Sequence, residues 1–273
     1  MSPRAKFQDP SSKRTRSCLS PPLEPGPKHE GLPPARAEKI LAELESIEYG
    51  EIQYDVASTD CYGYIQGQIP ILLSAPHGAK HLRGNRWKGE DEYTSALAVV
   101  VGRLTGAHVL YTKYKTAEDP NYDGKSRYKS LLKNIVREHG IRFLIDLHGA
   151  DWRRPFKLDV GIHTAKKDGS SCPTYLEIIW SVFKDFQSPL FNLCFPARGQ
   201  GTITSYCRRE LGIEAAQFEM NGKYRVLHRK PDSSRAHSLK EAHYRAEAKD
   251  VLEMISRMVL LIQRIYQKMR KAR

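Results

Sequence analysis

The stretch Phe143-Leu144-Ile145-Asp146-Leu147-His148-Gly149 decides the expected fold. It is a short, mostly apolar run bounded by glycine, which is typical of a strand buried inside a sheet. The segment before it, residues 126–139, has the apolar spacing of a helix, and Gly140 is placed to end that helix in a left-handed cap. A helix followed directly by a buried strand indicates an α/β unit.

The same alternation extends in both directions from this stretch. We expect strands at 71–74, 108–111, 143–147, 158–163, 191–195 and 215–219, and helices at 90–104, 126–139, 173–186 and 202–211. An earlier helix should begin after Pro34, a hairpin should join 62–65 to 69–73, and a long basic amphipathic helix should span 234–269. The pattern predicts a single α/β domain over residues 35–273, with a mostly parallel or mixed central sheet and helices on both faces.

Residues 1–34 have a different composition. Eight prolines are mixed with Ser, Lys and Arg, which predicts a disordered basic tail. The formal net charge of +13 comes from the two ends of the chain: residues 1–36 hold seven Lys/Arg against three Asp/Glu, and residues 223–273 hold fourteen against five. The remaining body is neutral, so nucleic acid is not the expected partner.

Several classes of protein are disfavoured by composition. No apolar run has the roughly 18 residues of a membrane helix, and no secretory signal is recognisable. The five cysteines form an odd and scattered set without a C-x-x-C pair. Reduced thiols and a cytoplasmic location are therefore expected. The oligomeric state is left open.

Three predicted strands end on polar residues that packing alone does not require. They finish with His77-Gly78, with Asp146-Leu147-His148-Gly149 and with Glu219. Ligand sites in open α/β sheets form where the carboxyl ends of strands converge. Asp146 and His148, two residues apart on a strand, share one face, so Asp146 is placed to orient the imidazole.

Two imidazoles and one carboxylate are the donor set of a catalytic zinc site that keeps a position for water. His77 and His148 supply the imidazoles, and the acidic run Glu90-Asp91-Glu92 supplies the carboxylate, with Asp91 favoured and Glu90 as the alternative. Zinc lowers the pKa of bound water to near 7. Glu219 is then the candidate to take the proton of that water and pass it to the leaving amine.

At these residues the chain resembles the N-formylglutamate amidohydrolase family, which is related in fold to the zinc carboxypeptidases. Six pieces occur in the family's order across about residues 70–225: Ala75–Gly78, Glu90–Thr94 with Leu97, Glu118–Asp123, Ile145–Gly149, Pro196–Thr204 and Glu219–Asn221. The resemblance implies a hydrolase of N-acyl amino acids, with zinc held by His77, the acidic residue near Asp91, and His148. It also implies Glu219 as general base and Arg198 near the substrate.

Two departures from the family pattern concern the substrate. Tyr122 and Gly222 stand where the family has arginine, so glutamate specificity does not follow; Lys223 or Arg225 could compensate, or the substrate differs. We assign Glu219 and Arg198 to catalysis, and Asn121, Arg198 and Asn221 to substrate binding.

The sequence thus predicts a zinc-dependent amidohydrolase that cleaves the amide bond of a small, anionic N-acyl or N-formyl amino acid, or of a related acyl amide. Two alternatives remain: a polyanion-binding protein acting through its basic ends, and a catalytically silent relative that binds a ligand without cleaving it.

Overall fold

The computed structural model of the protein describes residues 34–162, 175–188, 190–234 and 245–271. The predicted disordered tail lies outside the described residues except for Pro34, as do His163 and the first residues of the helix expected at 173–186.

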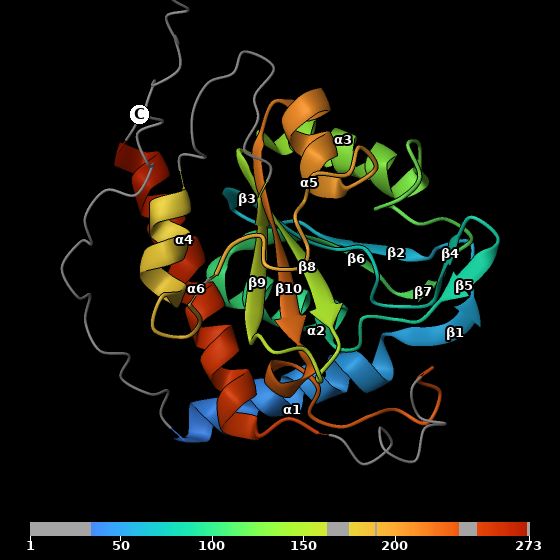
Figure 1. Cartoon of the computed structure of the whole chain (residues 1–273), viewed down its shortest axis with the longest axis horizontal. Helices are drawn as coiled ribbons and strands as arrows, with labels where there is room; N and C mark the ends of the chain where they lie inside the picture. The colour runs from blue at the N-terminus through green and yellow to red at the C-terminus, as the bar shows by residue number, and fades with distance from the viewer. Residues whose placement is uncertain (1–33, 163–174, 189, 235–244, 272–273) are drawn as a thin grey trace, which may run out of the picture.

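A six-stranded mixed sheet forms the centre of the molecule (Figure 1). Its order is β2 (Tyr62–Ile65), β6 (Ala107–Thr112), β3 (Ile69–Ala75), β8 (Phe143–Ala150), β10 (Glu214–Asn221) and β9 (Leu158–Ile162). The four inner strands run parallel, and the two edge strands are antiparallel to their neighbours. The predicted α/β class with a mixed sheet is confirmed.

Helices cover both faces of the sheet, which explains the apolar character of its strands. On one face lie α1 (Pro34–Gly50), α2 (Thr94–Thr105), α4 (Leu176–Phe183) and α6 (Ala248–Lys271); on the other lie α3 (Arg127–His139), α5 (Ile203–Tyr206) and the π-helical turn η1 (Cys207–Leu211). Neighbouring residues of a strand point to opposite faces. Leu72 and Leu144 therefore pack under α3, whereas Leu73 and Ile145 pack under α2 and α6.

One predicted strand pairing and one predicted strand are wrong. β2 does not form a hairpin with β3; it pairs with β6, because both edges of β3 are already occupied by β6 and β8. Residues 191–195 do not form a strand beyond a single bridge from Phe191 to Val160. The backbone N–H groups of residues 193–195 instead donate to the buried carboxylate of Asp159 at 2.7–2.9 Å.

Helix ends agree with the sequence where capping signals are strong. Ser126 caps α3 by accepting from the Lys129 N–H, and Gly140 ends it in the left-handed conformation, as predicted. The helix expected from residue 90 begins only at Thr94, and the helix expected from residue 234 begins at Ala248. Residues 235–244 of that last prediction lie outside the described residues.

Small elements that the sequence pattern missed complete the fold. β1 (Gln53–Ala57) pairs with β7 (Tyr114–Lys115), and β4 (His81–Arg83) forms a hairpin with β5 (Arg86–Lys88). The 3-10 turn η2 (Gly222–Tyr224) follows β10. None of the described helices is long and apolar enough to cross a membrane, and the described cysteines 61, 194 and 207 are unpaired.

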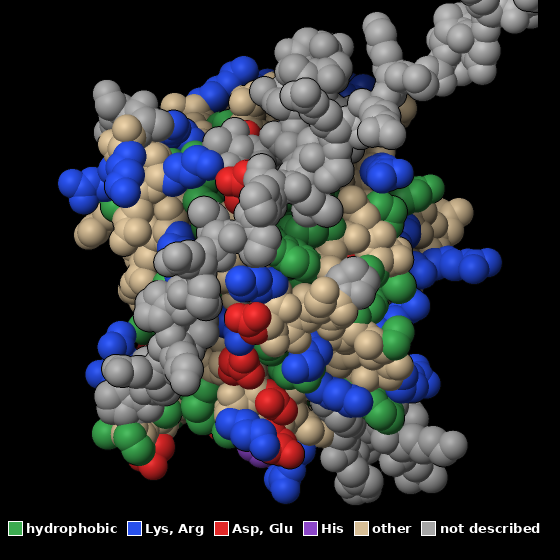
Figure 2. Space-filling view, turned by 60° about the vertical axis from the view of Figure 1, so that its left-hand side comes forward, with side chains coloured by type: hydrophobic (Ala, Val, Ile, Leu, Met, Phe, Trp, Pro, Cys, Tyr) green, Lys and Arg blue, Asp and Glu red, His purple; other side chains and the backbone are tan. Residues whose placement is uncertain are grey.

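The basic charge of the C-terminal helix is dispersed. Figure 2 shows the side of the molecule over α4 and α6, where Lys and Arg side chains are scattered and a short row of Asp and Glu lies among them. Arg257, within α6, is buried and pairs with Glu253 at 2.8 Å. This side therefore presents no continuous basic surface among the described residues.

Candidate active site

The three polar strand ends meet in one cavity, as the sequence predicted. Glu219 on β10 is in register with His148 on β8, and Asp146 on β8 is in register with Ser74 on β3, just before His77. These ends open into a cavity of about 560 Å³ whose lining includes His77, Asp91, His148 and Glu219.

Two imidazole nitrogens and one carboxylate oxygen converge in this cavity. Asp91 Oδ2 lies 3.5 Å from His77 Nδ1 and 3.4 Å from His148 Nδ1. The potential ligand atoms of these three residues all lie within 4.8 Å of one another. The backbone fixes part of this arrangement, because the Asp91 N–H donates to the His77 carbonyl at 2.7 Å.

The other two carboxylates of the acidic run turn away from the histidines. Glu90 accepts hydrogen bonds from the Ser233 hydroxyl and the Ser234 N–H, and Glu92 pairs with the Arg229 guanidinium at 2.9 Å. The run precedes α2 as a turn, in which Tyr93 has a left-handed φ of 64°. Among the three neighbours, the structure brings Asp91 to the histidines and does not bring Glu90.

Each histidine is held from behind by a buried carboxylate. Nε2 of His77 lies 2.9 Å from Asp119 Oδ1, and Nε2 of His148 lies 2.9 Å from Asp146 Oδ2. Asp146 is itself fixed by the Ser74 hydroxyl at 2.8 Å. A carboxylate that accepts the Nε2 proton leaves the Nδ1 lone pair free on the side that faces Asp91. Imidazoles at metal sites are commonly oriented in this way.

The pKa values of the two histidines and of Asp91 are shifted by their contacts with one another and with the carboxylates behind them. Burial by itself would lower the pKa of His148, but the charge of Asp146 and its hydrogen bond raise it well above the ordinary value. Burial would lower the pKa of His77 as well, but the hydrogen bonds to Asp119 and Asp91 together raise it. Burial would raise the pKa of Asp91, yet its contacts with both histidines hold it well below the usual range. The site therefore concentrates negative charge around two imidazoles.

A second possible cluster shares His77 but fits a cation less well. His77, His81 and Asp119 also lie close enough to hold an ion. However, the Arg83 guanidinium already pairs with Asp119 at 2.5 Å, and a fixed positive charge there opposes a metal ion. The ring of His81 instead stacks on that of His77 at 4.0 Å between centroids. The Nδ1 side, with His77, Asp91 and His148, is the position whose donor set fits zinc.

Glu219 faces the cavity from the end of β10. The residue is 7% exposed, and its carboxylate accepts a hydrogen bond from the Gln217 side-chain amide at 2.7 Å. Burial raises its pKa to about 7, although the positive charge of His148 opposes the shift. A buried carboxyl group with such a pKa can both hold and release a proton near neutral pH.

The residues assigned to substrate binding are placed differently from one another. Asn121 lines the cavity, with its amide 2.8 Å from His148 Nε2 and its carbonyl oxygen accepting the Ile203 N–H. Asn221 does not line the cavity; its amide is buried and donates to the carbonyls of residues 152, 154 and 156. Arg198 is exposed on a neighbouring loop, while Arg83 and Arg154 are the arginines that line the cavity.

Sequence reasoning missed Arg225 as a structural support of the site. This fully buried side chain donates to the backbone carbonyls of Glu92, Ala150 and Met220, which follow Asp91, His148 and Glu219 along the chain. A Cβ at Gly149 would lie 2.6 Å from the Arg225 guanidinium carbon, so the glycine after the histidine makes room for this side chain. Asp119 was also missed, although it lies in one of the family-like pieces.

A buried acid supports the turn that presents Asp91. Glu48 on α1 accepts the Tyr93 N–H at 3.1 Å and the Tyr54 hydroxyl. Burial raises its pKa to about 7, while those hydrogen bonds and the charge of Lys230 act in the opposite direction and Glu92 adds to the rise. The left-handed Tyr93 is thus fixed by an acid from another helix.

Comparison with known proteins identifies the fold. No protein family and no curated protein matches the sequence. The crystal structure of N-formylglutamate amidohydrolase from Ralstonia eutropha is similar, with a TM-score of 0.50, 15% identity, and coverage of 78% of this chain and 99% of that one. A bacteriophage poly-gamma-glutamate hydrolase gives a TM-score of 0.44 and 16% identity, over 78% of this chain and 93% of the other. The chain therefore has the α/β fold of N-formylglutamate amidohydrolase.

Proposed function

We propose that the protein is a metal-dependent hydrolase that cleaves the amide bond of an N-acyl amino acid or a related small acyl amide. The observation that carries this proposal is the convergence of two carboxylate-backed imidazoles and Asp91 in one cavity with Glu219. Packing alone does not require two carboxylate–imidazole pairs whose Nδ1 atoms both face Asp91.

His77, Asp91 and His148 would hold the metal, with zinc as the ion that best fits this donor set. When bound there, zinc supplies a Lewis acid and lowers the pKa of an attached water to near 7. Glu219 accepts the proton of the attacking water and returns it to the nitrogen of the leaving amine. Asn121 lies against His148 on the cavity wall and positions the acyl carbonyl.

Two arginines of the cavity wall could bind an anionic group of the substrate. Arg83 and Arg154 both line the cavity, and a guanidinium offers two parallel donors to a carboxylate. Neither occupies a position at which the family has arginine; those two positions hold Tyr122 and Gly222 in this chain. We therefore expect the carboxylate of the substrate to bind in a different position from that used by an N-formylglutamate hydrolase.

The test combines metal analysis with a screen for activity. Purified protein loaded with zinc is offered a panel of N-formyl and N-acetyl amino acids, and released formate, acetate or amine is measured. His148→Ala should reduce bound zinc and activity together. Glu219→Gln should keep the zinc and lower kcat by about 10²- to 10⁴-fold, the usual contribution of a positioned acid–base group.

Glu38→Gln, at an exposed glutamate on α1 that lines neither the cavity nor any neighbouring groove, is the matched control and should change neither quantity. A full zinc site that survives both His77→Ala and His148→Ala would refute the assignment.

A further inference from the structure

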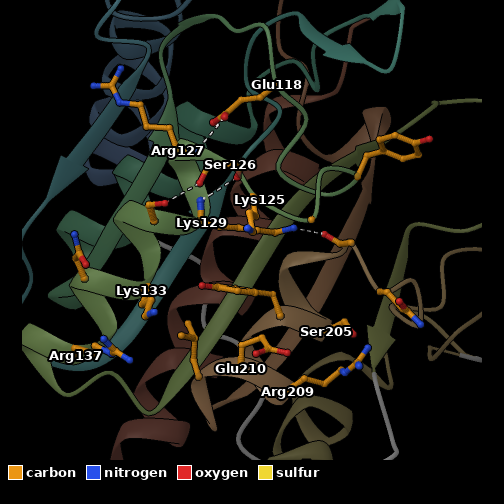
Figure 3. Close-up of a pocket in the computed structure, with 18 residues that line it drawn as sticks. Glu118, Lys125, Ser126, Arg127, Lys129, Lys133, Arg137, Ser205, Arg209 and Glu210 are labelled. Atoms are coloured by element: carbon orange, nitrogen blue, oxygen red, sulfur yellow. Dashed lines mark hydrogen bonds between the residues drawn. The ribbon is translucent and has the colours of Figure 1, made fainter.

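A second and larger groove lies beside the catalytic cavity. It has a volume of about 1250 Å³ and runs between α3 on one wall and α5 with η1 on the other (Figure 3). Figure 3 shows Lys133 and Arg137 along the α3 side, and Arg209, Glu210 and Ser205 on the opposite side.

The groove is lined by more cationic than acidic side chains. Lys125, Lys133, Arg137 and Arg209 line it, and none of them forms an ion pair with another described residue. Six Lys and Arg side chains stand in the lining against two acids, Glu118 and Glu210, so its formal charge is positive. Residues 37–222 carry no net charge as a whole, but cations outnumber acids along this groove.

Two cations of α3 lie one turn apart on the groove side. Lys133 and Arg137 are four residues apart, about 6 Å along the helix axis, and share one face of the helix. Lys125 precedes the helix, and the buried Lys129 ammonium is bound to backbone carbonyls. In an extended peptide, side chains on the same face recur at about 7 Å. The spacing of Lys133 and Arg137 therefore matches that of two same-face carboxylates in an extended acidic peptide.

The groove adjoins the catalytic cavity. Tyr122, which is 60% exposed, lines both. Two backbone segments held together separate them: the Lys129 ammonium donates to the Gly201 carbonyl at 2.7 Å, and the Ile203 N–H donates to Asn121. A chain that lies in the groove would therefore reach the cavity by crossing the exposed Tyr122.

We propose that this basic groove binds an acidic peptide segment, with its carboxylates along α3 and the amide to be cleaved at the metal site. This inference rests on the proposed function, which supplies the amide bond. The buried Ser205 hydroxyl lines the groove and has no hydrogen-bond partner among the described residues, so it offers a donor to the peptide.

The groove fits a peptide better than a single-stranded nucleic acid. Binding of single strands relies on several exposed aromatic rings on which bases stack. The described lining offers two aromatic residues, and the ring of Tyr206 is covered by the Lys129 ammonium at 5.6 Å. Tyr122 alone is a single stacking surface.

The experiment measures binding separately from catalysis. Rhodamine-labelled hexaglutamate is titrated with the full-length protein, and Kd is read from fluorescence anisotropy at 50 and 200 mM salt. Lys133→Glu/Arg137→Glu should weaken binding by about 10- to 30-fold, because two attractions become two repulsions at a solvent-exposed surface. Affinity for the unchanged protein should fall with salt.

Arg36→Glu/Lys39→Glu on α1 is the matched control, because it makes the same charge change on the other face of the sheet and should leave Kd unchanged. Lys133→Gln/Arg137→Gln gives a milder version if the reversed pair folds poorly, with an expected loss of about 3- to 5-fold. A labelled deoxythymidine oligomer of equal charge is titrated in parallel.

The outcomes separate the two proposals. Suppose that the screen detects no amide cleavage by the unchanged, zinc-loaded protein, and that the protein and its His148→Ala variant both bind hexaglutamate. The catalytic proposal then fails and the groove assignment stands. If both groove variants bind hexaglutamate as tightly as the unchanged protein, the groove assignment is overturned whatever the activity. Tighter binding of the oligomer than of hexaglutamate, lost in the groove variants, would overturn the peptide as ligand.

Discussion

Asp119→Asn is the sharpest test of how the metal site is built. The change keeps the shape of the side chain and removes its charge. In the protein, Asp119 is fully buried; one oxygen lies 2.9 Å from His77 Nε2 and 2.9 Å from the Asn121 N–H, and the other pairs with Arg83. Burial would raise the pKa of Asp119, but His77 and Arg83 hold it well below its ordinary value, so the native group is a carboxylate.

The size of the effect follows from the lost hydrogen bond. A hydrogen bond to a charged group contributes about 1.5–3 kcal/mol. Without the carboxylate, the Nε2 proton of His77 has a weaker acceptor, and the tautomer that presents Nδ1 to the metal is less favoured. Converted at 1.4 kcal/mol per factor of ten, zinc affinity should fall by about 10- to 100-fold.

Zinc affinity is measured by competition with a fluorescent chelator at pH 7.5, on protein first stripped of metal. Asp55→Asn is the control, since Asp55 is an exposed aspartate paired only with Lys80 and Lys115. Its affinity should match that of the unchanged protein. A zinc Kd for Asp119→Asn within twofold of the unchanged value would show that His77 does not depend on this carboxylate, and the reasoning would be wrong.

Two further changes test the supports behind the site. Arg225→Met should lower the free energy of unfolding in urea by about 3 kcal/mol, because buried carbonyls lose their donor; an unchanged midpoint would contradict this role. Glu48 has an ordinary pKa of 4.5 but a folded value of about 7, so between these pH values the folded protein holds a proton that the unfolded chain has lost. Glu48 should therefore lower the free energy of unfolding by about 3 kcal/mol as pH rises from 4.5 to above 7. Glu48→Gln, which cannot ionise beside Tyr54, Lys230 and Glu92, should remove this contribution and leave that of Glu219, whose pKa burial also raises to about 7. A pH slope equal to that of the unchanged protein would exclude Glu48 as a source.

Much of the catalytic cavity could be predicted because its signals are local. Gly140 and the buried run after it locate β8, and the two-residue spacing of Asp146 and His148 places both side chains on one face of the strand. Since carboxyl ends of parallel strands share one edge of a sheet, His77, His148 and Glu219 were expected together.

The edges of the sheet could not be predicted in the same way. Strand pairing joins segments that are distant in the chain, and β2 pairs with β6 instead of with its sequence neighbour β3. The segment at 191–195 has strand-like composition, but the buried carboxylate of Asp159 takes the N–H groups that a strand would use.

By itself, the sequence determined the order of strands and helices and the types of side chain at the strand ends, because periodicity and capping act over a few residues. Only the tertiary structure decided which of three consecutive carboxylates meets the histidines, and that Asp119 and Arg225 support the site. Those choices depend on contacts across more than forty positions of the chain: Glu48 fixes the Tyr93 turn from another helix, and the Arg225 guanidinium joins the turn at Glu92 to the end of β8. The same reason explains the basic groove, since the zero net charge of residues 37–222 leaves open where packing will bring the cations together.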